Sequence, residues 1–220
     1  MKNISLKEML AQDLPYGFLQ DLHKILGIIY PKSESEVNEN PDYGSSEAEY
    51  VLGHHRRALC ETRFREVGIE HGIECEMKQP INGGCKHVQL IIGRFRLSLC
   101  HIQSPGSFPR FSYVREQYAQ INEHISQTQI FPQESKPAEQ SFFGIIVHTE
   151  SNKKSQFGFA GIGFPNKDFH KWAQPPIDLH DIIECQSKPI EETNIKIAES
   201  EEASPKFKPN KVNRTNQRER

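Results

Sequence analysis

The segment 46–70 carries the residue types that acid–base chemistry beside a bound anion requires. At about 100° per residue in a helix, five of its side chains fall in one stripe. In such a stripe, an imidazole can relay a proton near neutral pH, and a carboxylate can act as a base or orient a guanidinium. Two arginines can hold a phosphate or carboxylate through paired N–H groups. The stripe consists of Tyr50, His54, Arg57, Glu61 and Arg65.

The same spacing also suits a wet helix face that takes no part in chemistry. Arg57 and Glu61 are four residues apart, as are Glu61 and Arg65, and opposite charges at this separation stabilise a helix in water. The sequence leaves both interpretations open. If the chain is an enzyme, we predict that His54 and Glu61 are its acid–base residues.

A second group of arginines lies around a predicted strand at 95–102. Arg94, Arg96 and Ser98 share one side of this strand, with His101 near its end, and apolar residues alternate with them. Arginines on a sheet face can follow a phosphate backbone, although this face lacks the aromatic residues that stack on bases. Charges that protect an edge strand from unwanted pairing would give the same pattern.

The third feature is the turn Ser104-Pro105-Gly106 and the helix predicted after it, near 109–127. Backbone N–H groups and the positive end of the helix dipole make a helix N-terminus able to bind an anion. An ordinary helix start explains the same residues. Across the three features, the arginines predicted to bind an anion are Arg57, Arg65, Arg94, Arg96, Arg110 and Arg115.

The distribution of charge also points to the middle of the chain. The formal net charge is -2, yet residues 50–120 carry 10 Lys and Arg against 6 Asp and Glu, while residues 1–49 carry 4 against 9. Eight of the arginines lie in this middle segment. Such asymmetry indicates an anionic partner, either nucleic acid or an acidic protein surface. Scattered ion pairs on a solvated surface are the structural alternative.

Several kinds of site are excluded or weakly supported. The number of cysteines is 5, which is odd, and no CxxC pair occurs, so neither a disulfide framework nor a thiolate zinc site is expected. Metalloprotease, nucleophile-elbow and dinucleotide motifs are absent, and we predict no metal site and no cofactor. The triplet Glu76-Met77-Lys78 is faintly similar to the core of the restriction-endonuclease-like superfamily, but the next predicted strand lacks the acidic residue which that site needs.

The predicted elements favour an α+β fold. Apolar residues at helical spacing predict N-terminal helices, a long central helix and a further helix. Strand-like runs bounded by turn residues predict a three-strand meander before that further helix and a C-terminal hairpin after it. Grouped strands with short turns indicate a largely antiparallel sheet with the helices packed on it. The predicted helices are 6–13, 16–29, 46–70, 109–127 and a short one near 168–172; the predicted strands are 73–77, 86–92, 95–102, 142–149 and 157–164, with an extended piece at 177–183.

This pattern divides the chain into four parts. We predict an N-terminal helical segment (1–30), a flexible acidic linker (31–46), an α+β core domain (47–185) and a disordered charged tail (186–220). The apolar stripe of residues 6–29 is a predicted docking surface for a protein partner. No signal peptide or membrane-length apolar run is recognisable, so the expected location is cytoplasmic, with no membrane partner.

Three function hypotheses follow. The first is a binding or regulatory protein, bacterial or phage by its amino-acid usage, whose arginine-rich middle engages nucleic acid or an acidic protein. The second is an enzyme acting on a phosphate-containing substrate, such as a nuclease or a nucleotide-processing enzyme. The third is an interaction module that docks through its N-terminal helices. Convergence of the three arginine-bearing features in space would favour a site over a wet surface.

Overall fold

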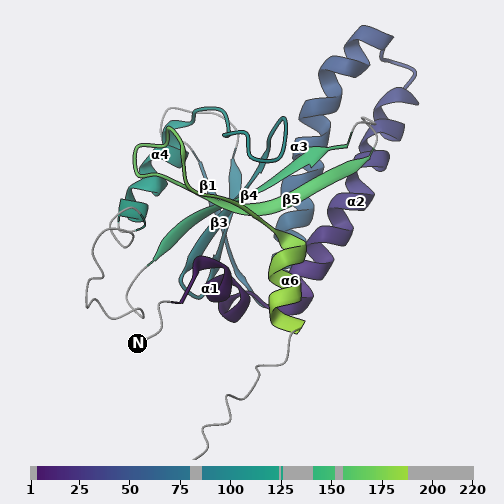
Figure 1. The fold of residues 1–220 in the computed structure, drawn as a ribbon. Coiled ribbons are helices and arrows are strands. Elements are labelled where there is room, and N and C mark those ends of the chain that lie inside the picture. Colours follow the sequence, from purple (N-terminus) through teal and green to yellow (C-terminus); the bar gives the residue numbers. More distant parts are fainter. Residues whose placement is uncertain (1–3, 80–85, 124, 126–140, 152–155, 188–220) are drawn as a thin grey trace, which may run out of the picture. The chain divides into compact units, whose positions relative to one another are not determined.

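The protein is built around one six-stranded sheet. A computed structural model describes residues 4–79, 86–123, 125, 141–151 and 156–187, all within the compact unit Met1–Pro189. The strands follow one another across the sheet in chain order (Figure 1). They are β1 (Glu74–Lys78), β2 (His87–Ile92), β3 (Phe95–His101), β4 (Phe142–Glu150), β5 (Phe157–Pro165) and β6 (Trp172–Asp178).

Two antiparallel meanders share this sheet. β1, β2 and β3 form the first, and β4, β5 and β6 form the second. β3 and β4 join them as a parallel pair, in which Ser98 lies opposite Ile145 and His101 opposite His148. The predicted α+β class, the three-strand meander and the C-terminal hairpin are therefore confirmed, and the parallel junction is a feature that local pattern did not predict.

One face of the sheet is covered by α1 (Leu6–Asp13), α2 (Tyr16–Asn38), α3 (Ser45–Glu70) and α6 (Leu179–Ser187). α2 and α3 run side by side across it (Figure 1). Leucines at helical spacing on α1 and α2, with Phe18, enter the same core as Leu90, Leu97 and Ile146 of the sheet. The N-terminal helices are thus part of the core.

This burial takes up much of the docking stripe predicted on residues 6–29. Five of its apolar members are at most 2% exposed, whereas Leu6, Met9 and Ile25 are partly buried against the same core. The buried members include Leu10, Leu14, Phe18, Leu22 and Leu26.

The other face is covered by a shorter layer. α4 (Tyr113–Ala119) and a following 3-10 turn pack on Phe143, Ile145 and Val147 of β4. The buried side chain of Asn122 holds this layer in place: its amide donates to the carbonyl oxygens of Phe143 and Pro165, at 2.8 and 2.9 Å, and accepts from the Phe143 N–H.

The predicted linker at 31–46 is mostly helical. α2 continues through Pro31 to Asn38, and α3 begins at Ser45. Pro31 removes one helical hydrogen bond, but Ser33 donates to the Tyr30 carbonyl, and the burial of Tyr30, Ser33 and Val37 keeps the helix folded against the core. Tertiary packing here overrides the local signal of proline and acidic residues.

Two other boundaries differ from prediction. The helix expected at 109–127 starts only at Tyr113, because the chain forms a turn at Ser104–Ser107 and then an irregular loop up to Ser112. The region 172–178 is an edge strand, where Pro175 and Pro176 are tolerated, and Leu179 and Ile182 then open α6 instead of continuing an extended piece. The turn 82–84 and the tail after 187 lie outside the described residues.

A buried guanidinium ties α2, α3 and β4 together. Arg56 on α3 is 4% exposed; it forms an ion pair with Glu150, donates from Nε to Ser33 Oγ at 3.0 Å, and lies 4.4 Å from the ring centre of Tyr30. A buried charge is tolerated when it is paired and hydrogen-bonded in this way.

We expect the substitution Arg56→Met to lower the free energy of unfolding by about 2–3 kcal/mol, because Glu150 and Ser33 lose their partner; Glu150 is partly exposed, so this lies below the full penalty for breaking a buried pair. The measurement is urea denaturation followed by circular dichroism. The matched control is Arg57→Met, at the exposed neighbouring position, which should change stability by less than about 0.5 kcal/mol. Equal effects of the two variants would contradict this role for Arg56.

Candidate functional site

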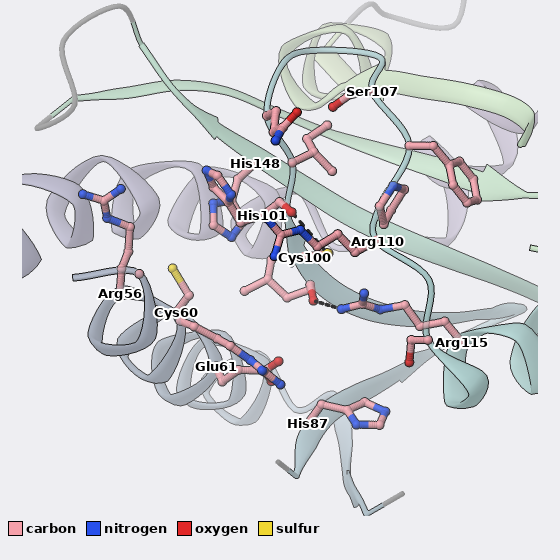
Figure 2. A pocket seen from close by; sticks show the side chains of 18 of the residues that line it. Arg56, Cys60, Glu61, His87, Cys100, His101, Ser107, Arg110, Arg115 and His148 are labelled. Atoms are coloured by element: carbon pink, nitrogen blue, oxygen red, sulfur yellow. Dashed lines mark hydrogen bonds between the residues drawn. The ribbon is translucent and has the colours of Figure 1, made fainter. Parts of the chain in front are cut away.

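A pocket of about 740 Å³ opens at the end of the sheet where β3 and β4 finish. α3 forms one wall, and the loop 103–112 with the start of α4 forms the other (Figure 2). Ligands of open sheets often bind at the carboxyl ends of neighbouring parallel strands, and β3–β4 is the parallel pair of this sheet.

The pocket exists because β2 and β3 part at this end. Their antiparallel pairing runs from Ile92–Phe95 to Gln89–Ser98, and one further step would place Val88 opposite Leu99. Instead the Val88 N–H donates to Glu61 Oε2 at 2.8 Å, and Arg115 Nη2 donates to the Leu99 carbonyl at 3.5 Å. Side chains from α3 and α4 thus satisfy backbone groups that the two strands no longer exchange, as buried backbone groups require.

The pocket is cationic. Four guanidiniums line it, against the two carboxylates of Glu61 and Glu150. Arg56 is paired with Glu150, whereas no carboxylate in the described part of the chain forms an ion pair with the other three. Those three are Arg57, Arg110 and Arg115.

The pKa values of ionisable groups in the pocket are shifted, some upward and some downward. Burial raises the pKa of Glu61, although the Val88 N–H and the nearby Arg57 and Arg115 oppose the shift. Burial lowers the pKa of His101, assisted by Arg56 and Arg110 and opposed by Glu150. The pKa of His87 is also lowered, by burial and by neighbouring positive charges. Displaced values of this kind are common at functional sites.

His148 is a deeply buried ionisable group of the pocket, with 3% of its surface exposed. It lies on β4 opposite His101 of β3, and their ring centres are 5.5 Å apart. On its other side, Nδ1 lies 2.8 Å from the hydroxyl of Tyr30 on α2. Burial, His101 and Arg56 lower the pKa of His148 to about 3, so the ring is neutral at physiological pH.

The wall opposite α3 has an apolar part. Phe108 is fixed by a tilted contact with Phe169 and an edge contact with Trp172, with ring centres 4.9 and 4.8 Å away. Phe111 stands at the rim and is 53% exposed. The pocket therefore offers a cationic region for an anion and an apolar surface for the rest of a ligand.

The structure brings together four of the predicted site residues and leaves the others apart. Glu61, Arg57, Arg110 and Arg115 line the pocket; Arg110 lies in the loop before α4 and Arg115 in the first turn of α4. The ion pairs predicted between Glu61 and its arginine neighbours are not among those formed by the described residues. Outside the pocket lining lie Tyr50, His54, Arg65, Arg94 and Arg96.

The arginines of the third strand have separate positions. Arg94 donates hydrogen bonds from Nε and Nη2 to the carboxylate of Asp13 on α1, at 2.8 and 2.9 Å. Arg96 is exposed, while Ser98 on the same side is buried beneath the α4 layer. β3 is a central strand, so edge protection does not explain them. Glu76 of the nuclease-like triplet pairs with Lys78 on β1, outside the pocket lining.

The sequence contained signals for the residues that were missed. Arg56 falls on the apolar stripe of α3, at helical spacing from Cys60, Phe64 and Val67, where a charge needs buried partners. His148 interrupts a run of apolar residues in a strand that is buried on both faces. A polar residue in such a place indicates a partner or a function.

Comparisons of the chain with protein-family models, curated proteins and solved structures gave no match. None of the described helices is both long and apolar enough to cross a membrane. Within the described ranges, no group of three or more His, Cys, Asp and Glu residues is arranged to hold a metal ion. The pocket is therefore the feature from which a function can be inferred.

The depressed pKa of His148 predicts a pH-dependent stability. The unfolded chain takes up a proton near pH 6.5, whereas the folded chain does so only near pH 3, so stability is full above pH 6.5 and falls as the pH drops below it. From pH 7.5 to 5.5 the contribution lost is about 1.4 kcal/mol. Urea denaturation at both pH values should show this loss in the wild type and a smaller one in His148→Gln. Identical pH dependence of the two proteins would contradict it.

Proposed function

We propose that the pocket binds a small ligand, or the end of a chain, that carries a phosphate or a similar oxyanion. The observation that carries the proposal is the gathering of Arg57, Arg110 and Arg115 around one cavity without a carboxylate partner among the described residues. Guanidiniums that line one cavity repel one another, and an oxyanion relieves that repulsion while accepting hydrogen bonds from their N–H groups.

The shape of the site favours a compact anionic group over a long polyanion. An extended nucleic acid needs cationic side chains spaced along a surface, whereas these arginines surround a cavity of about 740 Å³. The exposed Arg65 and Arg96 lie outside its lining. The anionic partner expected from the sequence is accordingly proposed to be a single oxyanion with an attached organic part.

Substitution of the pocket arginines tests this proposal. We expect Arg57→Ala and Arg110→Ala each to weaken the binding of phenyl phosphate about tenfold or more, because each loses a charge-assisted hydrogen bond. Isothermal titration calorimetry gives the dissociation constants. The matched controls are Arg65→Ala on the same helix and Arg96→Ala on the neighbouring strand, which should bind as the wild type does. A wild type without saturable binding, or equal losses in the controls, would refute the proposal.

A second candidate function is catalysis on the bound phosphate ester. The observation that favours it is the presence of His101 and Glu61 in one pocket, with pKa values displaced in opposite directions. An imidazole whose pKa is lowered can accept a proton from water, and a carboxyl group whose pKa is raised can more readily give one to the leaving oxygen.

Phosphate release from phenyl phosphate tests the catalytic role. We expect turnover by the wild type and a loss of about 100-fold in His101→Ala. The control His54→Ala, at an exposed position of α3 outside the pocket, should keep the wild-type rate. Binding without turnover would leave a binding protein and exclude the enzyme for this ester.

A further inference from the structure

We propose that His148 donates its Nε2–H to an oxygen of the anion bound in the pocket, and that Tyr30 fixes the tautomer that makes this possible. The inference rests on the proposed function, because it assigns a further ligand-binding residue to the same site. It adds an uncharged donor of fixed orientation to the guanidiniums that line the pocket.

The hydroxyl of Tyr30 is a hydrogen-bond donor in the protein interior. Tyr30 is 0% exposed, and burial raises its pKa far above the usual value, so the phenol keeps its proton. Within the described residues, the partner of this hydroxyl is Nδ1 of His148, at 2.8 Å. A buried O–H needs an acceptor, and Nδ1 can accept only when it carries no proton itself.

The position of the proton on the His148 ring follows from the neutrality of that ring. A neutral imidazole carries one proton, and with Nδ1 accepting from Tyr30 that proton must be on Nε2. No described residue hydrogen-bonds to this nitrogen, and the His148 side chain lines the pocket beside His101 (Figure 2). Nε2 is therefore a fixed donor in the pocket, and an oxyanion is the acceptor that suits it.

The surroundings keep His148 neutral over a broad pH range. His101 and Arg56 both disfavour a positive charge on the ring, and burial disfavours it most. Glu150 is paired with Arg56 and so provides little counter-charge. The titratable and charged groups around the ring are Tyr30 of α2, Arg56 and Cys60 of α3, His101 of β3 and Glu150 of β4.

The tautomer is tested in the free protein by long-range nitrogen–proton NMR of the histidine rings. We expect His148 to give the Nε2–H pattern from pH 8 to 5.5, and Tyr30→Phe to shift it toward a mixture of tautomers. An Nδ1–H pattern in the wild type, or an imidazolium pattern at pH 6, would overturn the proposal whether or not any ligand binds.

The contact with the ligand is tested with sulfate, whose charge is constant over this pH range. The double variant Tyr30→Phe/His148→Phe removes the donor and leaves no unpaired hydroxyl. We expect it to bind sulfate about tenfold more weakly than the wild type, with the same ratio at pH 8 and pH 5.5. The control is His23→Gln on α2, whose ring contacts a different histidine, and this change should leave the affinity unchanged.

The outcomes separate this inference from the proposed function. If Arg57→Ala weakens sulfate binding and the double variant does not, the pocket binds an anion without His148. If neither change matters, the proposed function fails as well. An affinity ratio that grows at low pH would show a charged His148 and would also overturn the inference. A double variant that does not fold leaves the NMR result on the wild type to decide.

Discussion

The pocket depends on one constraint, which is that the backbone groups of Val88 and Leu99 must be satisfied after their strands separate. Glu61 and Arg115 reach them from opposite layers of the structure, one from α3 and the other from α4. The opening in the sheet is therefore held by two charged side chains that also line the cavity. Both side chains become part of the site because the fold needs them there. Burial at this position raises the pKa of Glu61, and the hydrogen bond from Val88 opposes that shift.

A second network fixes the wall on the helix side. Arg56 joins α2, α3 and β4, and its neighbours Tyr30 and His148 form the next contact toward the cavity. Each of these three side chains is buried and has a partner from another element, so moving one helix would leave several groups unpaired. The same contacts that anchor α2 and α3 thus determine which nitrogen of His148 faces the pocket.

Sequence reasoning found the parts of this arrangement that are local. Helical periodicity placed Arg57 and Glu61 on one stripe, alternation indicated β1 and β3, and strand-like runs between turn residues indicated β2, β4 and β5. It could not separate Arg57 from Arg65, because both are exposed on α3 and only the position of the sheet end distinguishes them. The role of Arg94 depends on Asp13, 81 residues away in the chain, and the helix through Pro31 depends on tertiary packing. Non-local partners, which no spacing rule reports, decided each of these cases.

The parallel pairing of β3 with β4 also bears on how the site forms during folding. The antiparallel strand pairs are joined by short connections, whereas the parallel pair brings together residues as distant in the chain as Ser98 and Ile145. Closing so long a loop is slow compared with forming a hairpin. His101 and His148 come from the two sides of that pairing, so the pocket is assembled only when the two meanders dock. A spectroscopic probe placed in the pocket would report the last cooperative step of folding, and secondary-structure signals would precede it.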